Sequence, residues 1–161
     1  MAYGTPATVA LDNLDITFIP HPYAHDPAAT EYGVEAATAI GIGIGAEQVF
    51  KTLMTVVDED LIVAVVPVSG TLDLKALATV LHAKKAVMAD PLVAQRRTGY
   101  VIGGISPIGQ KTAHRTVIDE TVNLFDTVYV SGGKRGFDIE LAPKDLVRAT
   151  EATVAAIART H

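Results

Sequence analysis

Apolar and polar residues are arranged along this chain in short blocks, most of them of the length of a β-strand. Apolar and β-branched side chains dominate residues 49 to 57 and 61 to 68, and Asp58-Glu59-Asp60 separates the two blocks. This composition around a short polar break is typical of a β-hairpin. Further short strands are predicted at residues 16 to 19, 86 to 89, 100 to 102, 116 to 119, 127 to 130 and 137 to 141.

Helices are predicted where apolar residues recur at helical spacing behind a capping residue. Thr5-Pro6 is a typical helix start, with Thr as the N-cap and Pro at the first helical position. A second apolar helical face follows from Asp73 to His82, with the acidic Asp73 near the N-terminus of the predicted helix. Helices are therefore expected over residues 7 to 14, 31 to 40, 73 to 82, 91 to 97 and, after Ala142 as the cap, 143 to 159.

The order of these elements favours an α/β fold without a simple alternation of strand and helix. Strands outnumber helices, so we predict a mixed, strongly curved, barrel-like β-sheet surrounded by helices. The 161 residues, 49% of them hydrophobic, are enough for one compact domain with a substantial core. No internal repeat or linker is evident, and a single domain over residues 1–161 is expected.

Composition excludes several classes of function. A net charge of −5 gives no protein-wide positive field, so any RNA contact must use a local patch or a partner protein. The absence of cysteine excludes disulfides, a thiol nucleophile and thiolate metal sites, and it fits a cytoplasmic location. No apolar run reaches the roughly 18 residues that a membrane span needs. No signal peptide is visible, so no membrane association is expected.

Two glycine-containing segments are candidates for binding an anion. In residues 99 to 109, a predicted strand leads into Gly103-Gly104, where a ligand can approach the backbone closely. Exposed backbone amides there can donate to a phosphate, a carboxylate or an oxyanion. In residues 131 to 136, Lys134-Arg135 forms a compact basic turn between glycines. An ordinary turn explains each segment as well.

Lys51 stands at the start of a predicted strand that is otherwise apolar. If Phe50 and Thr52 face one side of this strand, Lys51 faces the other side together with Leu53. A lysine at such a position is either an outward edge residue whose stem covers apolar surface, or it points into a pocket and binds an anion. The pattern leaves both interpretations open.

Two segments of the sequence are similar to nucleotide-binding motifs but do not match them. Residues 104 to 112 contain one residue too many before Lys111 for a Walker A loop, and Pro107 removes an amide from the phosphate cradle. The glycines at positions 41, 43 and 45 follow a predicted helix instead of a strand, which argues against a dinucleotide fingerprint.

Metal-dependent and serine-dependent chemistry lack complete residue sets. His21 and His25, with Asp26, resemble a metal cluster, but neighbouring prolines prevent a helix and no third ligand is evident. Solvated loop histidines are the preferred interpretation, and no metal or other cofactor is expected. The three serines at positions 69, 106 and 131 lie outside any Gly-x-Ser-x-Gly motif.

Four motifs occur in an order and spacing that identify a family. They are Val49-Phe-Lys-Thr-Leu, Met88-Ala-Asp-Pro-Leu, Gly99-Tyr-Val-Ile-Gly-Gly-Ile-Ser-Pro-Ile-Gly and Tyr129-Val-Ser-Gly-Gly-Lys-Arg-Gly-Phe-Asp-Ile-Glu-Leu. Together they resemble the YbaK-type Cys-tRNA(Pro) deacylases (the YbaK/EbsC family), which are related to the editing domain of prolyl-tRNA synthetase. The resemblance covers nearly the whole chain, and residues 113 to 124 match least well.

The resemblance implies an activity and its partners. It implies a trans-editing enzyme that removes cysteine from mischarged Cys-tRNA(Pro), with prolyl-tRNA synthetase present in a ternary complex. The thiol of the substrate would attack its own ester carbonyl, leaving a thiolactone and free tRNA. The enzyme would then be a hydrolase with a lyase-like step, acting on the acceptor end of tRNA(Pro).

The resemblance also assigns roles to positions of this sequence. Lys51 is the signature lysine, placed to hold the terminal adenosine or the aminoacyl group. The predicted catalytic positions are Lys51, Gly103, Gly104 and Asp138. The predicted substrate-binding positions are Tyr23, Thr52, Ser106, Pro107 and Ser131, together with the basic turn of Lys134 and Arg135.

The residues themselves agree with such a mechanism, although they also fit different functions. Without a cysteine, a triad or a metal site, what remains is positioning of the substrate and stabilisation of an oxyanion. An Ala-tRNA(Pro) deacylase would instead need a water nucleophile. The same residues also fit a tRNA- or synthetase-binding module without chemistry, and a barrel that binds small anions.

Overall fold

The computed structural model describes residues 4–26, 28, 32–40 and 45–160. Its helices are α1 (Pro6–Asn13), α2 (Tyr32–Ile40), α3 (Leu74–Val80), α4 (Pro91–Thr98), the 3-10 helix η1 (Glu120–Leu124) and α5 (Pro143–Thr150). Its strands are β1 (Ile19–Pro22), β2 (Phe50–Val57), β3 (Asp60–Pro67), β4 (Gly70–Leu72), β5 (Ala86–Met88), β6 (Arg115–Asp119), β7 (Val128–Lys134), β8 (Phe137–Leu141), β9 (Thr153–Ala155) and β10 (Ala158–Thr160). No helix within these ranges has the length and apolar character needed to cross a bilayer.

The largest sheet is mixed, as the sequence predicted. Its five strands follow the order β5-β2-β3-β6-β9. The predicted hairpin is confirmed, since β2 pairs antiparallel with β3 along its whole length. β6 lies parallel to β3, and β9 lies parallel to β6. Connections between parallel strands cannot be tight turns, and the intervening chain forms α3, α4 and the cavity described below.

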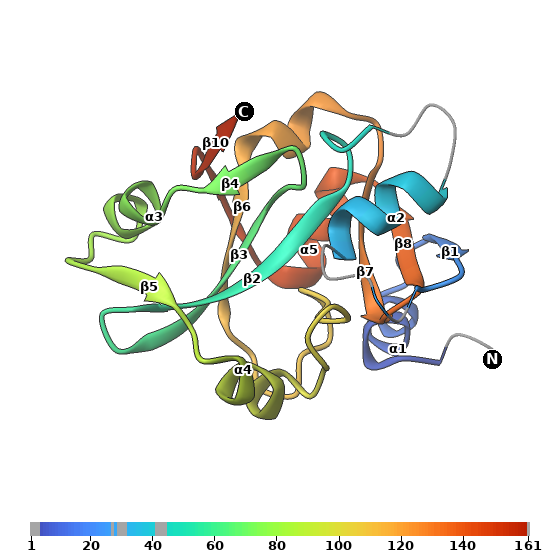
Figure 1. The fold of residues 1–161 in the computed structure, drawn as a ribbon, viewed down its shortest axis with the longest axis horizontal. Coiled ribbons are helices and arrows are strands. Elements are labelled where there is room, and N and C mark those ends of the chain that lie inside the picture. The colour runs from blue at the N-terminus through green and yellow to red at the C-terminus, as the bar shows by residue number, and fades with distance from the viewer. Residues whose placement is uncertain (1–3, 27, 29–31, 41–44, 161) are drawn as a thin grey trace.

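The barrel-like description is not confirmed, because the strands form separate sheets. β1, β8 and β7 make a three-stranded antiparallel sheet, and β10 and β4 make a two-stranded one. A single bridge between Val49 and Tyr129 joins the first of these to the large sheet. One bridge is not a continuous ladder, so the strands of the described residues do not close into a barrel. In Figure 1, β7 and β8 stand to the right of β2 and β3.

The core explains why β3 is apolar from Leu61 onwards. Val63 and Val65 pack into the cluster between the two main sheets, together with Phe137 and Ile139 of β8. The intervening side chains of β3 turn to the opposite face and pack with α3 and the C-terminal segment. A central strand that is buried on both faces needs apolar residues at every position instead of an alternating pattern.

Several helix predictions are confirmed together with their caps. Thr5 caps α1, and Pro6 occupies its first turn. Asp73 caps α3 by accepting a hydrogen bond from the Ala76 amide at 3.0 Å. α4 ends at Gly99, whose φ of 80° is the left-handed conformation that glycine adopts without strain.

The strand predicted at residues 100 to 102 is wrong. α4 ends at Gly99, and the following amides bond locally: that of Tyr100 to Thr98 Oγ1 at 3.2 Å and that of Ile102 to Gln95 Oε1 at 2.9 Å. Tyr100 itself is buried and donates its hydroxyl to the Ile108 carbonyl at 2.7 Å. Apolar side chains here serve a packed loop, which periodicity does not distinguish from a short strand.

Both ends of the chain also differ from prediction. The first strand is β1, not residues 16 to 19, and it includes both prolines. It is an edge strand, and the Tyr23 amide just beyond it bonds to the Gly136 carbonyl, so the alternate positions Pro20 and Pro22 face away from β8. The C-terminal helix stops at Thr150, because Glu151 turns the chain at φ 52° and β9 and β10 follow.

Candidate active site

A cavity of about 560 Å³ lies along the first half of β2. β2 pairs with β5 only from Thr55 to Val57, and among the described residues no strand pairs with its outer edge from Lys51 to Leu53. The cavity occupies this uncovered edge, with α2 at one end and β5 and α4 at the other. Its volume is in the range of small-molecule sites, which run from roughly 300 to 1,000 Å³.

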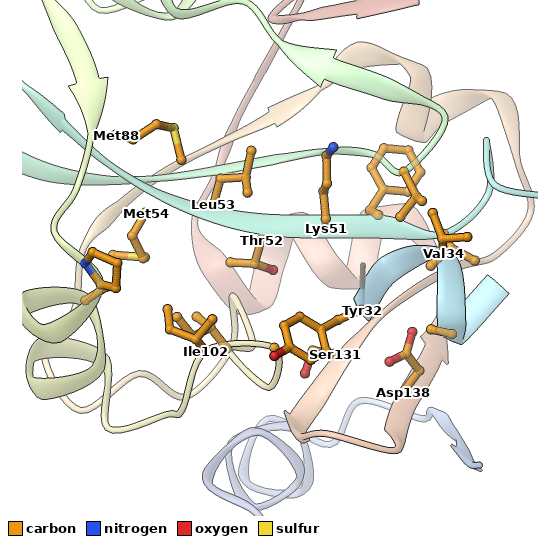
Figure 2. Close-up of a pocket in the computed structure, with 18 of the residues that line it drawn as sticks. Tyr32, Val34, Lys51, Thr52, Leu53, Met54, Met88, Ile102, Ser131 and Asp138 are labelled. Carbon is orange, nitrogen blue, oxygen red and sulfur yellow. The ribbon is translucent and has the colours of Figure 1, made fainter. Parts of the chain in front are cut away.

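One side of the cavity is polar, and we call it the polar wall. It consists of Tyr23, Thr52, Ser131 and Asp138. Figure 2 shows Thr52, Ser131 and Asp138 on the same side of β2. They come from β2, β7, β8 and the segment after β1, so the fold unites residues more than one hundred positions apart. All four were predicted as site residues from the sequence.

Asp138 is the most unusual group in this wall. Its side chain is only 5% exposed, and it has no hydrogen bond or ion pair within the described part of the chain. Burial raises the pKa of this carboxyl to about 7. A buried carboxylate without a partner is costly, and such groups concentrate at functional sites. At neutral pH, Asp138 is therefore able both to accept and to release a proton.

Two hydroxyl groups of the polar wall are in different states. Burial, and next the charge of Asp138, raise the pKa of Tyr23, so its phenol stays protonated and can donate. Thr52 Oγ1 is buried and has no hydrogen-bond partner within the described residues. The Val68 amide bonds to the Val49 carbonyl, so alternation directs the peptide groups of Thr52 towards the cavity edge. An unpaired hydroxyl and an open strand edge together can bind a polar ligand.

The other side of the cavity is apolar, and we call it the apolar wall. It consists of Met54, Met88, Ala94 and Ile102. Met54 is 5% exposed, and its Sδ accepts a hydrogen bond from Gln110 Nε2 at 3.7 Å. The same side chain of Gln110 is bonded to His114 Nδ1 at 2.8 Å. The apolar wall is thus supported from behind by a chain of polar contacts.

Lys51 lines the cavity from a different direction. Figure 2 shows Lys51 and Leu53 projecting from the face of β2 opposite to Thr52 and Met54. This alternation confirms the predicted orientation of the strand. The Lys51 ammonium and the Asp138 carboxyl therefore lie on different faces of β2. Of the two interpretations left open by the sequence, the position in a cavity wall is the observed one.

Gly103 lies under an aromatic ring instead of facing open space. Its φ is 86°, and a Cβ there would lie 2.8 Å from the ring of Tyr32. Arg135 lies over the same ring, with its guanidinium carbon 5.0 Å from the ring centre, and donates from Nε to the Ile102 carbonyl at 2.7 Å. The missing side chain thus allows the Tyr32 ring to pack on the loop, where it lines the cavity.

The rest of the first glycine segment lies behind the cavity wall. A Cβ on Gly104 would lie 2.7 Å from Lys134 Cα, and the Gly104 amide is already donated to the Val101 carbonyl at 2.8 Å. Ser106 is fully buried, and its Oγ accepts from the Ile108 amide at 3.2 Å. Pro107 is buried as well. Of the positions predicted as site residues in this segment, Gly103 alone lines the cavity, together with the apolar residues Ile102 and Ile105.

The second glycine segment is mostly strand. β7 continues to Lys134, and the turn is limited to Arg135 and Gly136. Lys134 and Arg135 do not line the cavity; Lys134 lies over the Phe137 ring with Nζ 5.7 Å from its centre. Ser131 Oγ accepts from the Gly133 amide at 3.2 Å, a local contact that fixes its hydroxyl beside the cavity.

His21 and His25, which the sequence analysis considered as metal ligands and did not favour, contact separate carboxylates. His21 Nε2 lies 2.8 Å from Glu140 Oε1, and His25 Nδ1 lies 2.7 Å from Glu35 Oε1. Within the described ranges, no three His, Cys, Asp or Glu side chains are grouped closely enough to hold a metal ion. Glu35 Oε2 also accepts from the Asp26 amide at 2.8 Å, so this pair ties the segment after β1 to α2.

Sequence reasoning missed Tyr32 and the whole apolar wall. Tyr32 begins α2, and no local pattern indicates that its ring covers Gly103. Met54 and Ile102 belong to apolar segments that resemble core. The motif Met88-Ala-Asp-Pro-Leu was noticed for its resemblance alone, although it carries Met88 into the cavity. The predicted glycine run at positions 41 and 43 lies outside the described residues.

A buried carboxyl, an unpaired hydroxyl and an apolar end in one cavity define a site for a ligand that is polar at one end and apolar at the other.

The profile of the aminoacyl-tRNA editing domain family matches residues 26–149. The chain belongs to this family. Its activity class is aminoacyl-tRNA editing, that is, deacylation, and the resemblance found in the sequence is confirmed.

Individual relatives agree with this assignment. The chain is 39% identical over 122 residues, 75% of this chain and 74% of the other, to "Putative Cys-tRNA(Pro)/Cys-tRNA(Cys) deacylase EbsC" of Enterococcus faecalis. It is 28% identical over 121 residues, 73% of this chain and 77% of the other, to the uncharacterized protein YwhH of Bacillus subtilis. A crystal structure described as "a putative trans-editing enzyme for prolyl tRNA synthetase" superposes with a TM-score of 0.81 at 25% identity, covering 96% of this chain and 95% of that chain.

Proposed function

We propose that this protein removes cysteine from Cys-tRNA(Pro) and that the thiol of the substrate is the nucleophile. The observation that carries the proposal is Asp138, a buried carboxyl without a hydrogen-bond partner among the described residues, on the wall of a cavity in a chain without cysteine. The 39% identical relative whose name includes Cys-tRNA(Pro) supports the choice of substrate. Cytoplasmic location, a single domain and a ternary complex with prolyl-tRNA synthetase stay predictions.

In the proposed reaction, the enzyme positions one molecule so that it reacts with itself. The cysteinyl sulfur forms a bond to its own ester carbonyl carbon, and the bond from that carbon to the ribose oxygen breaks. The thiol proton is transferred to the departing ribose oxygen, so the products are a thiolactone and tRNA. A thiol has an ordinary pKa near 8.5, and the pKa of Asp138 is raised to about 7. Asp138 is therefore suited to accept this proton and return it.

The remaining site residues bind and orient the substrate in this proposal. Tyr23 and Thr52 donate to the ester or the ribose from the polar wall. Lys51, on the other face of β2, holds a negatively charged or carbonyl oxygen of the terminal nucleotide. The amide of Gly103 is the candidate donor for the oxyanion, since that of Gly104 is engaged with Val101. The chemistry needs little more than positioning, because nucleophile and carbonyl are already in one molecule.

The test compares three esters that differ only in the amino acid. Deacylation rates of Cys-tRNA(Pro), Ala-tRNA(Pro) and Pro-tRNA(Pro) are measured with the wild type and with Lys51→Ala. Loss of cysteine alone, dependent on Lys51, is the expected result. Faster deacylation of Ala-tRNA(Pro) would mean that the nucleophile is water and not a thiol of the substrate. No turnover of any ester, with prolyl-tRNA synthetase present, would leave a binding module.

Two further esters test the thiol step itself. In S-methylcysteinyl-tRNA(Pro) the sulfur is retained but the thiol proton is lost, and in Ser-tRNA(Pro) a weaker nucleophile replaces the thiol. Both esters should be released at least about a hundredfold more slowly than the cysteinyl ester, the lower end of what a positioned reacting group contributes. Equal rates would show that the thiol takes no part.

A further inference from the structure

Charged residues are distributed unevenly along the sequence segments that flank the cavity. The first 50 residues contain six Asp or Glu and no Lys or Arg. They supply α1, β1, the segment with Tyr23, and α2, which is one flank of the cavity. Residues 84 to 115 contain six Lys or Arg and a single Asp. This segment forms β5, α4 and the loop with Ile102, and these elements together make the opposite flank of the cavity. Figure 2 shows Val34 of α2 and Met88 of β5 at opposite ends of the cavity.

Three basic residues of the second flank form one patch, which we call the α4 patch: Arg96, Arg97 and Lys111. All three side chains are exposed. The Lys111 amide bonds to the Thr98 carbonyl at 2.8 Å and the Thr112 amide to the Arg97 carbonyl at 3.2 Å, so the loop returns alongside the end of α4. No ion pair neutralises these three charges within the described ranges.

The α4 patch is connected directly to the mouth of the cavity. Gln95, the residue before Arg96, accepts from the Ile102 amide at 2.9 Å, and Arg135 donates to the Ile102 carbonyl at 2.7 Å. Ile102 is thus fixed between α4 and the β7–β8 turn. Leu92, one helical turn before Arg96, is 73% exposed, and α4 lies near the bottom of Figure 1.

Building on the proposed function, we propose that the α4 patch binds the sugar–phosphate backbone of the tRNA acceptor stem. When a terminal nucleotide occupies the cavity, the phosphates that precede it must leave through its mouth. The basic flank attracts these phosphates, so the RNA approaches over α4. Arginine forks suit phosphate oxygens, and backbone contacts add affinity without selecting a sequence. The patch supplies the local positive charge that a chain of net charge −5 requires for RNA.

The experiment compares a substrate that reaches the patch with one that does not. The patch variant carries Arg96→Ala, Arg97→Ala and Lys111→Ala. Its kcat/KM for full-length aminoacylated tRNA should fall on the order of tenfold or more at about 0.1 M salt, with kcat unchanged. Its kcat/KM for an aminoacylated CCA trinucleotide should equal that of the wild type. The plot of log kcat/KM against the logarithm of the salt concentration has a negative slope, and its magnitude should become smaller by about one for each charge removed.

Two further variants separate charge from structure. Arg96→Lys with Arg97→Lys keeps the charge and should retain most of the affinity. Lys144→Ala with Arg148→Ala removes two exposed charges on α5, away from the cavity lining, and should leave both substrates unaffected. An equal loss with tRNA and trinucleotide would overturn the proposal, as would no loss with either. A loss seen only when prolyl-tRNA synthetase is present would assign the patch to that protein partner instead.

Direct binding keeps the proposal testable if no ester is hydrolysed. Fluorescence anisotropy with a labelled acceptor-stem RNA hairpin that carries no amino acid measures the affinity of the wild type, the patch variant and the α5 control. Weaker binding by the patch variant alone would support the RNA surface while the deacylase assignment fails. Equal binding by all three proteins would overturn the RNA surface whatever the activity.

Discussion

The polar and apolar walls of the same cavity differ in what burial of their side chains does to the stability of the protein. The apolar wall extends the core: Met54 is buried, belongs to the main cluster and is held by Gln110. The polar wall contains Asp138, which is equally buried but has no partner within the described residues. Burial stabilises the first side chain and destabilises the charged form of the second.

This difference distinguishes a wall that selects by shape from a wall that takes part in chemistry. An apolar wall recognises a ligand by its volume, and each methylene contributes modestly to that selection. An unpaired buried carboxyl recognises nothing by shape, but its raised pKa lets it exchange a proton near neutral pH. Four substitutions test the two walls and then the elements that support them, from the largest expected effect to the smallest.

Replacing Asp138 by Asn should have the largest effect, and the effects on activity and stability should be opposite. Deacylation should fall on the order of a hundredfold or more, since the proton acceptor is lost. Because the folded pKa of about 7 lies above the unfolded value, the wild type loses stability as pH rises from about 4 to 7. The variant lacks this loss and should be more stable at pH 8, by at most about 4 kcal/mol.

Urea unfolding between pH 4 and pH 8, together with deacylation rates, checks this prediction. Asp145→Asn makes the same chemical change in the first turn of α5, where a negative charge is favourable. This control should lower stability by about 0.5 kcal/mol and leave the activity unchanged. If Asp138→Asn proves less stable than the wild type at pH 8, the carboxyl has a stabilising partner and the interpretation of the polar wall is wrong.

Gly103→Ala tests the boundary between the two walls. The φ of 86° strains any side chain, and the new Cβ would meet the Tyr32 ring at 2.8 Å, so stability should fall by about 1–3 kcal/mol and the ring should be displaced. Gly99→Ala has a similar φ of 80°, but its Cβ would meet the Lys111 side chain instead. Both variants should lose stability on unfolding in urea, whereas deacylation of an aminoacylated CCA trinucleotide, which does not reach the α4 patch, should fall in Gly103→Ala alone.

Much of the polar wall could be predicted from the sequence, because its residues lie in motifs. Tyr23, Thr52, Ser131 and Asp138 were singled out and all line the cavity. The prediction of Lys51 on the opposite face of β2 from Thr52 followed from strand alternation alone. Gly104, Ser106 and Pro107 belong to the same motif as Gly103 but lie behind the wall, since a motif records that residues matter without saying whether they touch a ligand or pack.

The apolar wall and parts of the fold were not predictable for a different reason. Met54 and Ile102 have the same apolar character as core residues, and only the uncovered edge of β2 turns them towards a cavity. The end of the last helix depends on Glu151 in a left-handed conformation, which few non-glycine residues adopt. After it, Asp119 Oδ1 accepts from the amides of Ile157 and Ala158, a long-range contact that holds the final strands in place.

Met54→Ala tests whether the apolar wall selects by size. The variant should lose about 2 kcal/mol of stability, the lower end for such truncations, because the side chain already borders a cavity. The added space should raise the relative rate for aminoacyl groups larger than cysteine by about tenfold, the order of one methylene. Met54→Leu keeps the volume and should retain both selectivity and stability. A changed stability with unchanged selectivity in Met54→Ala would mean that this wall contacts the nucleoside instead of the amino acid.

Glu35→Gln should have the smallest effect, because it alters an outer support of the polar wall and leaves the wall itself unchanged. The hydrogen bond from His25, and next the one from the Asp26 amide, lower the pKa of Glu35, so the ionised carboxylate stabilises the segment after β1 against α2 at neutral pH. That contribution is present above the ordinary pKa of a glutamate and is lost as pH falls through the lowered value. Thermal unfolding should therefore show a slightly lower Tm for Glu35→Gln at pH 7 and no difference once Glu35 is protonated.

Because Tyr32 and Val34 of α2 line the cavity, KM should rise modestly while kcat is kept. Glu47→Gln, which changes an exposed glutamate away from the cavity lining, is the matched control and should alter neither quantity. A fall in kcat as large as that of Asp138→Asn would instead place the His25–Glu35 pair in the chemistry of the polar wall.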